Sequence, residues 1–513
     1  MKKPNASPAL ITIPIMLATI MQALDTTIAN VALPHMQGSL AATQDQISWV
    51  LTSYIVAAAI MMAPSGFISA RIGRKRLFVI SVVGFTIASM LCGIATSLDQ
   101  MVLYRLLQGV FGAALVPLSQ ATLLDIYPRE KHGSAMAMWG VGVMLGPILG
   151  PTLGGYLTEY YNWRWVFFIN LPIGIFALLG IVALVPETEI DRNRPFDAFG
   201  FAWLSLALGA LQMMLDRGEL KDWFSSTEII VEATLSGLGF YMFIVHMMTH
   251  AHPFLTPRLF KDRNFVIGLL FIFVVGIILL ATMALLPPFL QNLKHYPVVT
   301  TGYVMAPRGI GTMISMLVVG RLLGKFDVRL IILVGLGLAI ISLWQMSNFN
   351  FDTDISALTI SGIIQGLGLG GIFVPLSAIT FATLEPALRT EATALFSLMR
   401  NLGSAIGVSI VNWLLSRNTQ INHAELAQHI TVLNPLLKAP YAPDMWSPTE
   451  RSGLIALDQL VNAQASMISY LNDFLFMMWI TIAAIPMLLL LRKPRKPQSK
   501  EEAEAEAAAA IAD

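Results

Sequence analysis

Long apolar blocks recur along almost the whole chain, from residue 8 to residue 491, and they restrict the fold more than any other feature. An α-helix needs about 20 apolar residues to cross about 30 Å of lipid hydrocarbon. About fourteen blocks reach this length, and short polar links separate most of them. With 56% hydrophobic and 12% charged residues, the chain cannot cover a water-facing surface. We therefore predict an all-α integral membrane protein.

Each block predicts one transmembrane helix, with boundaries set by the neighbouring polar residues. The predicted spans are 8–33, 47–69, 77–94, 101–126, 134–157, 165–184, 199–215, 227–247, 265–286, 301–323, 330–346, 355–382, 393–415 and 467–491.

The Lys and Arg residues give these spans a direction, because cytoplasmic loops retain positive charge. With the N-terminus inside, most of the 32 Lys and Arg residues fall in segments on the cytoplasmic side. Shifting the count by one span would destroy this alternation. Fourteen spans with both termini in the cytoplasm are therefore favoured, and twelve spans remain the alternative if the blocks at 199–215 and 227–247 do not cross the membrane.

An internal repeat divides the chain. Gln108-Gly109, followed by Val-Pro-Leu-Ser at 116–119, returns as Gln365-Gly366, followed by Val-Pro-Leu-Ser at 374–377. Transporters often contain two such repeated halves. The predicted organisation is an N-terminal six-helix bundle at 1–185, two linker transmembrane helices at 186–262, a C-terminal six-helix bundle at 263–491 with a periplasmic loop at 416–466, and a cytoplasmic tail at 492–513.

Asp25 lies inside the first predicted span. Burying a charge near the bilayer centre costs about 2.5 to 3.5 kcal/mol on insertion scales, so intramembrane acids are rare and usually functional. A carboxyl group that binds and releases a proton there can exchange that proton for a cation. We interpret Asp25 as a proton-coupling group, and a purely structural carboxylate held by polar neighbours is the alternative.

Arg105 precedes Gln108 by about one helical turn in the fourth predicted span. Arginine stays protonated in proteins, so Arg105 can hold a carboxylate in its ionised form. The alternative is an arginine that reaches toward the outer membrane surface. Other intramembrane polar residues that we interpret as coupling or substrate-contacting groups are Gln22, Asn30, Gln108, Arg400 and Asp473.

The fifth predicted span carries glycines at intervals of four residues together with two prolines. Such glycines form a smooth face that another helix can approach closely, and proline removes a backbone donor and kinks a helix. Packing alone explains the glycines, but not both prolines. We predict a kinked helix at a moving interface, and the residues concerned are Gly142, Gly146, Pro147, Gly150, Pro151 and Gly154.

The first cytoplasmic loop, residues 66–77, is basic and contains two glycines. Its charge could act only as a topology signal, but the glycines indicate a tightly packed turn as well. We predict a conformational motif that includes Gly66, Arg71, Gly73 and Arg74.

Several classes of function are disfavoured. A net charge of +1 does not suit nucleic acid binding, and the single cysteine, Cys92, cannot form a disulfide or a CxxC site within the chain. The chain has neither a Ser/His/Asp set nor a phosphate-binding glycine loop with its lysine. We therefore predict no enzyme activity, no metal site and no cofactor, with an ion gradient as the energy source.

These residues resemble motifs of the major facilitator superfamily. Residues 66–77 resemble its loop motif, residues 105–109 its fourth-span motif and residues 142–155 the fifth-span motif associated with antiporters. Residues 24–34 are similar to the first span of fourteen-span drug:proton antiporters. Residues 163–174 and 215–226 are similar to Emr-type pumps of Gram-negative inner membranes.

The resemblance implies the major facilitator fold in a bacterial inner membrane and proton-driven export of hydrophobic or cationic toxic compounds by alternating access. It also implies contact with membrane lipid and with a periplasmic adaptor and an outer-membrane channel. The usual acid before the first arginine of the loop motif is Ala70 here, so the gating contact of that acid is absent. An exporter of an amphipathic metabolite or fatty acid, or a membrane sensor without transport, remains the alternative.

Overall fold

The structure is a computed structural model that describes residues 7–188, 190–191, 195–250, 253–432, 434, 437, 446–447 and 449–492. Most described residues are helical, and the β pairing among them is one isolated bridge between Leu323 and Phe326. The prediction of an all-α protein is therefore confirmed. The predicted cytoplasmic tail beyond Arg492 and much of the tip of the predicted periplasmic loop lie outside the described residues.

The N-terminal half and the inserted segment contain twelve labelled α-helices. They are α1 Pro8–Ser39, α2 Gln44–Ile47, α3 Trp49–Met62, α4 Ser65–Ile72, α5 Arg74–Ile94, α6 Leu98–Gly112, α7 Leu115–Ile126, α8 His132–Tyr160, α9 Trp165–Phe168, α10 Asn170–Leu184, α11 Ala198–Arg217 and α12 Thr227–Thr249.

The C-terminal half contains the remaining labelled α-helices, followed by a 3₁₀ turn. They are α13 Arg263–Pro288, α14 Val298–Leu322, α15 Val328–Met346, α16 Ile355–Phe381, α17 Arg389–Ala427 and α18 Arg451–Ala484, with the 3₁₀ turn at Ile485–Leu490.

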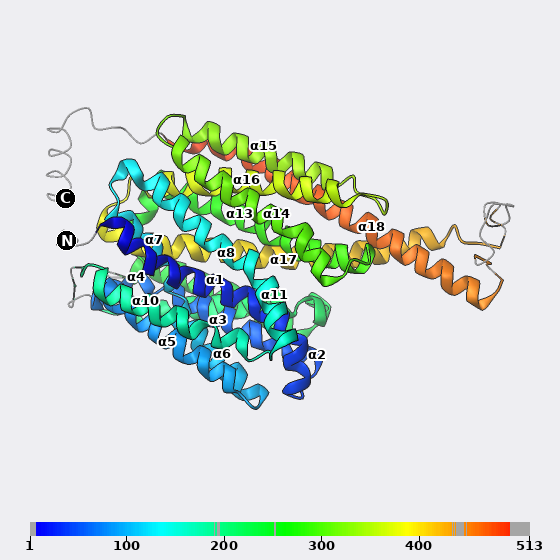
Figure 1. The fold of residues 1–513 in the computed structure, drawn as a ribbon, viewed down its shortest axis with the longest axis horizontal. Coiled ribbons are helices and arrows are strands. Elements are labelled where there is room, and N and C mark those ends of the chain that lie inside the picture. The colour runs from blue at the N-terminus through cyan, green and yellow to red at the C-terminus, as the bar shows by residue number, and fades with distance from the viewer. Residues whose placement is uncertain are drawn as a thin grey trace.

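The span count agrees with fourteen. By length and composition, 13 helical segments of the described chain can cross a membrane, and the pair α3 and α4 makes a fourteenth if it is one span bent by 56°. Both α11 and α12 are among the candidates, so the twelve-span alternative is disfavoured. The helices lie roughly along one direction, with the N-terminal half on one side and the C-terminal half on the other (Figure 1).

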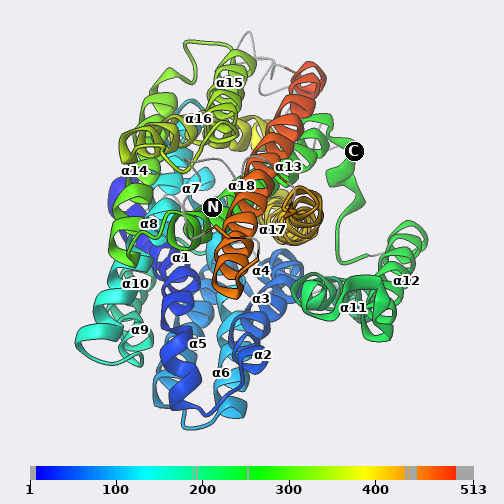
Figure 2. The same cartoon turned by 90° about the vertical axis from the view of Figure 1, so that its right-hand side faces the viewer.

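The inserted helices do not separate the two halves. Figure 2 shows α11 and α12 beside the bundles, where α11 contacts both α3 and α17. The halves contact each other directly, through α8 with α14 and through α4 and α7 with α17. Within the N-terminal half, α1 packs against α8 and α10. This arrangement places Asp25 of α1 inside the N-terminal bundle.

Helices α17 and α18 extend well beyond the other helices at one end of the bundle (Figure 1). With 39 residues, α17 is about 58 Å long, against about 30 Å of hydrocarbon. The predicted periplasmic segment 416–466 is therefore helical over much of its described part, since α17 ends at Ala427 and α18 begins at Arg451. Hydropathy marks only where a helix leaves the lipid, and polar residues continue both helices into water.

Candidate functional site

A buried ion pair lies inside the N-terminal bundle. The Asp25 Oδ2 atom of α1 accepts a hydrogen bond from Arg105 Nη1 of α6 at 2.7 Å, and the two side chains are 0% and 1% exposed. Asp25 Oδ1 accepts from Gln108 Nε2 at 2.8 Å and from Asn170 Nδ2 of α10 at 2.9 Å. Both carboxylate oxygens are thus compensated, as a buried charge requires.

The guanidinium of Arg105 is fixed from several directions. Its Nε donates to the Val50 carbonyl at 3.1 Å and its Nη1 also donates to Gln108 Oε1 at 2.8 Å. Its Cζ lies 4.4 Å from the ring centre of Tyr54, whose hydroxyl accepts from Gln22 Nε2 at 3.1 Å. Arg105 therefore does not reach toward the membrane surface, and Gln22 belongs to the outer part of the same cluster.

The glycine face of α8 holds α1 in position. Cβ atoms added at Gly142, Gly146 and Gly150 would overlap Met16, Ala23 and Thr27 of α1 respectively. At Gly154 an added Cβ would lie 3.0 Å from the side chain of Ile28. The helices touch so closely that Thr27 Oγ1 donates to the Gly146 carbonyl at 2.9 Å. The close helix approach predicted from the glycine spacing thus occurs, and its partner is the helix that carries Asp25.

The two prolines of α8 are less buried than the four glycines. The helix runs without interruption from His132 to Tyr160 through both prolines, and Pro147 is half-buried whereas Pro151 is exposed. Their role in a conformational change stays a prediction.

A second ionic cluster joins the two halves at the end predicted to be cytoplasmic. Asp125, at the end of α7, pairs with Arg74 through Oδ2, and its Oδ1 accepts from Arg389 Nη1 of α17 at 2.6 Å. Arg74 Nε also donates to Thr390 Oγ1 of the C-terminal half at 3.1 Å. We call Arg74, Asp125, Arg389 and Thr390 the cytoplasmic latch. Its charges are almost entirely buried, so separating them without new partners is costly.

The loop motif builds its share of the latch through its glycines. Gly73 has a φ of +95°, which lets the chain turn sharply from α4 into α5 and brings Arg74 to Asp125. A Cβ at Gly66 would lie 2.6 Å from the Glu391 Cα atom, so α4 touches α17 directly. Arg71, by contrast, is exposed and forms no ion pair with any residue that the structure describes. The acid missing at Ala70 is thus not needed for this latch, because Asp125 supplies the carboxylate.

Further contacts between the halves extend inward from the latch. Thr393 Oγ1 donates to the Pro117 carbonyl at 3.1 Å, and Ser134 Oγ donates to the Gly320 carbonyl at 3.3 Å. The molecule is therefore closed toward the cytoplasm in this conformation.

The C-terminal half contains a partial counterpart of the Asp25 cluster. Gln365 is the repeat counterpart of Gln108, 257 positions later in the chain. The same offset places Thr282 at the position that corresponds to Asp25. Gln365 Nε2 indeed donates to Thr282 Oγ1 at 3.2 Å. The repeat therefore preserves the amide but replaces the carboxylate with a hydroxyl.

Not every predicted site residue joins the Asp25 cluster. Asn30 is exposed, and Arg400 is half-buried and bonds to Asn401 Oδ1 at 3.5 Å. Asp473 is buried in the C-terminal half, in α18. The sequence analysis did not identify Asn170 as a partner of Asp25, and it did not identify Asp125 or Arg389 as site residues. The position of Asp125 in the last turn of a predicted span was a signal that could have singled it out.

The cytoplasmic ends of α11 and α12 meet at Asp197. Burial opposes the charged form of this carboxyl, but hydrogen bonds from the Gly200 amide, His246 and the Phe254 amide outweigh burial and hold its pKa below the ordinary value. Possible ligand atoms of Asp197, His246 and His250 lie within 4.8 Å of one another. Because the carboxylate caps α11 and the His246 and His250 rings stack at 4.6 Å, we assign this cluster a structural role.

A two-bundle membrane fold, with a buried ion pair in one bundle and a latch between the bundles, defines a membrane transporter. A model of the Major Facilitator Superfamily matches residues 15–408. The structure of the proton:xylose symporter XylE bound to 6-bromo-6-deoxy-D-glucose aligns with a TM-score of 0.62 at 14% identity, over 97% of this chain and 98% of that chain. That structural likeness concerns the fold alone.

Two relatives are more similar in sequence to this chain than the XylE structure is. The chain is 37% identical over 441 residues to the multidrug export protein EmrB of Escherichia coli (strain K12), covering 85% of this chain and 86% of that protein. It is 35% identical over 492 residues to the fatty acid resistance protein FarB of Neisseria gonorrhoeae, covering 96% and 97%. The chain therefore belongs to the major facilitator superfamily, within its Emr-type family, and it is a multi-pass protein of the bacterial inner membrane.

Proposed function

We propose that the protein is a proton-driven multidrug exporter that moves hydrophobic and cationic compounds out of the bacterial cytoplasm by alternating access. The similarity to EmrB supports the class of substrate. The observation that carries the coupling mechanism is the Asp25–Arg105 pair, because it buries an ionisable carboxylate in a helix that also forms part of the bundle interior. Burying an acid inside the membrane is costly, and such acids usually have a function.

Protonation of Asp25 is the central step of the proposed cycle. A proton that enters from the outer side binds Asp25 and removes its negative charge, which leaves Arg105 with weaker partners in Gln108 and the Val50 carbonyl. The cluster then rearranges, because a buried guanidinium without a counter-ion is unfavourable. Substrate binding from the cytoplasm follows release of that proton to the inner side.

The glycine face of α8 transmits this rearrangement. Because α1 and α8 touch through Thr27 and Gly146, a shift of α1 must be followed by α8, which also packs against α14 of the other half. Opening toward the cytoplasm then requires the Asp125 carboxylate to separate from Arg389. The latch thus keeps the inner side closed while the coupling site exchanges its proton with the outer side.

The long α17–α18 hairpin is the proposed contact for a periplasmic adaptor protein, which would connect the exporter to an outer-membrane channel. Its support is its reach beyond the lipid together with exposed apolar side chains, including Ile421, Leu454 and Ile455. A variant that lacks residues 418–460, and therefore most of the projecting hairpin, tests this role. We expect it to abolish drug resistance in cells while leaving transport in isolated vesicles intact, and loss of both activities would contradict a separate docking role.

Efflux of a cationic dye tests the main proposal. Cells that express the protein should extrude ethidium, and an uncoupler should abolish the extrusion. In inverted vesicles, ethidium uptake should stop when the pH gradient is collapsed. Uptake that is indifferent to the gradient would exclude proton coupling.

Export of fatty acids is the second candidate, because the match to FarB covers 96% of this chain. The two candidates differ in substrate charge, since long-chain fatty acids are anionic and ethidium is cationic. Protection of cells against chemically unrelated cationic dyes supports the multidrug exporter. Protection against long-chain fatty acids alone would support the second candidate.

A further inference from the structure

The C-terminal half buries an acid without any compensation. The Asp473 side chain of α18 is 0% exposed, and neither of its carboxylate oxygens has a hydrogen-bond partner among the described residues. Asp25 in the N-terminal half is equally buried but receives hydrogen bonds from three side chains. The two buried acids of the membrane interior thus have opposite environments in one conformation.

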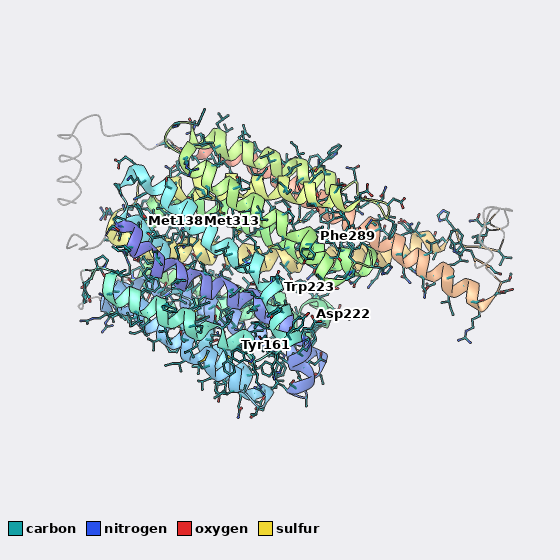
Figure 3. All side chains as sticks on the ribbon, in the orientation of Figure 1. Met138, Tyr161, Asp222, Trp223, Phe289 and Met313 are labelled. Carbon is teal, nitrogen blue, oxygen red and sulfur yellow. The ribbon has the colours of Figure 1, made fainter. Side chains whose placement is uncertain are left out.

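Two aromatic residues, Tyr470 and Phe474, lie near Asp473 in the sequence of α18. Tyr470 and Phe474 are both buried, and their ring centres lie 5.4 and 6.2 Å from that of Phe289. Phe289, labelled in Figure 3, lies in the C-terminal half. Phe289 begins a π-helical turn that directly follows Pro287 and Pro288 at the end of α13. π-Helical turns often occur at functional sites, and the two prolines withdraw backbone donors from this part of α13.

Among the residues that the structure describes, no ionisable group of a neighbouring span pairs with Asp473. Helices α13, α15 and α17 pack against α18. Residues 264–293 and 330–346 contain no ionisable side chain. The ionisable side chains of α17 lie elsewhere: Arg389 pairs with Asp125, Glu391 bonds to Thr256, Arg400 bonds to Asn401, the Arg417 Cζ lies 5.2 Å from the Trp413 ring centre, His423 contacts Asp458, and Glu425 is exposed. A charged carboxylate without partners is costly in such surroundings, whereas a neutral carboxyl group is tolerated.

Asp473 also lies close to the depth of the C-terminal counterpart of the coupling site. Thr282, which the repeat matches with Asp25, donates to Met477 Sδ of α18 at 3.7 Å. Asp473 precedes Met477 by one helical turn, which is about 6 Å along the helix. The two halves therefore each contain one buried carboxyl group at a related depth.

We propose that Asp473 is a second proton-carrying group of the transport cycle. In the conformation closed toward the cytoplasm it holds a proton on its carboxyl group. When the inner side opens, the O–H bond breaks, the proton passes to water that enters from the cytoplasm, and the carboxylate takes up a new proton from the outer side in the next cycle. This inference rests on the proposed proton-driven export and adds a second proton to it.

The number of protons decides whether transport moves net charge. Exchange of two protons for one monovalent cation transfers one positive charge per cycle, so a membrane potential alone can drive it. Exchange of a single proton at Asp25 for the same cation transfers no net charge and responds only to a pH gradient. Proteoliposomes that contain the purified full-length protein, with ethidium as the monovalent substrate, distinguish these cases.

The decisive variant is Asp473→Asn, which resembles the protonated side chain in shape. For the wild-type protein, a potassium diffusion potential set by valinomycin should accelerate ethidium transport at equal pH on both sides. For Asp473→Asn this acceleration should be lost, while transport driven by a pH gradient persists. Asp473→Glu should restore the response to the potential, and Asp458→Asn, which changes an exposed acid of the same helix, should behave as wild type.

Other outcomes overturn specific claims. A wild-type protein that responds to the pH gradient but not to the potential contradicts the second proton carrier and leaves the proposed function intact. A response to the potential that survives in Asp473→Asn, or that Asp473→Glu fails to restore, contradicts the role of Asp473. A wild-type protein that is indifferent to both gradients overturns the proposed function itself.

Discussion

The Asp25–Arg105 pair allows its energetic coupling to be measured directly. Asp25→Asn keeps the size of the side chain and one oxygen that can accept from Gln108 or Asn170, which lie 2.8 and 2.9 Å from Asp25 Oδ1. It leaves Arg105, which is 1% exposed, without its counter-ion. Removing one partner of a buried ion pair typically costs about 3 to 5 kcal/mol, and we expect this loss in the free energy of unfolding.

Replacing both charges should cost much less than the sum of the single changes. Arg105→Met removes the guanidinium, and in the double variant Asp25→Asn/Arg105→Met no uncompensated charge remains. We expect a coupling energy of about 2 to 3 kcal/mol between the two sites. Unfolding of the detergent-solubilised protein, followed as SDS is added, gives the four stabilities. Arg400→Met changes an arginine outside the cluster, so its loss of stability should simply add to that of Asp25→Asn. If the losses caused by Arg105→Met and Asp25→Asn also add, the reasoning is refuted.

Three further predictions follow from close contacts. Gly146→Val should destabilise the protein and abolish transport, because any Cβ at this position meets the Ala23 backbone. Thermal melting and dye efflux measure the two effects. Gly155→Ala, whose new Cβ has no neighbouring atom within 4 Å, should behave as wild type in both assays. Asp125→Asn should open the cytoplasmic side, so that labelling of a cysteine introduced on that side, in a protein without Cys92, rises several-fold. Arg71→Ala should leave the labelling of the same introduced cysteine unchanged. Cys92 is buried, so a maleimide should label Cys92 of the wild-type protein only after the protein has been unfolded. Rapid labelling of the folded protein would contradict the buried position of Cys92.

Hydropathy and charge were sufficient to predict the architecture. Each span needs a long apolar block because lipid cannot satisfy backbone polar groups, and this requirement is visible in the sequence. The same logic predicted one set of intramembrane coupling and substrate-contacting residues, because polar side chains are costly in lipid. Of that set, Asp25, Arg105, Gln108 and Gln22 lie together, whereas Asn30, Arg400 and Asp473 lie elsewhere. The glycine spacing of α8 predicted a close helix contact in the same way.

Of the charged residues of the latch, only Arg74 was predicted, as part of the loop motif. Asp125 and Arg389 could not be predicted, because charged residues near the ends of spans are common and do not indicate a partner in the other half. Arg389 and Asp125 are 264 positions apart in the sequence, and only the packing of the two halves brings them together. Helix geometry explains the exclusion of Asn30, which follows Asp25 by five residues and is therefore rotated by about 140° around α1. For Asp473, the sequence indicated a buried acid, but it could not indicate that every neighbouring span would leave this acid without a partner.

Transport by the Asp25→Asn variant tests the coupling mechanism most directly. Two modes of ethidium transport need to be compared in proteoliposomes: accumulation driven by a pH gradient, and counterflow, which exchanges labelled for unlabelled substrate without a gradient. Asp25 is the obligatory exchange site in this account, and Asp473 adds a proton only to a cycle that exchange at Asp25 drives. Asp25→Asn should therefore lose gradient-driven accumulation while still catalysing counterflow. Accumulation that continues to follow the pH gradient in Asp25→Asn would contradict the account.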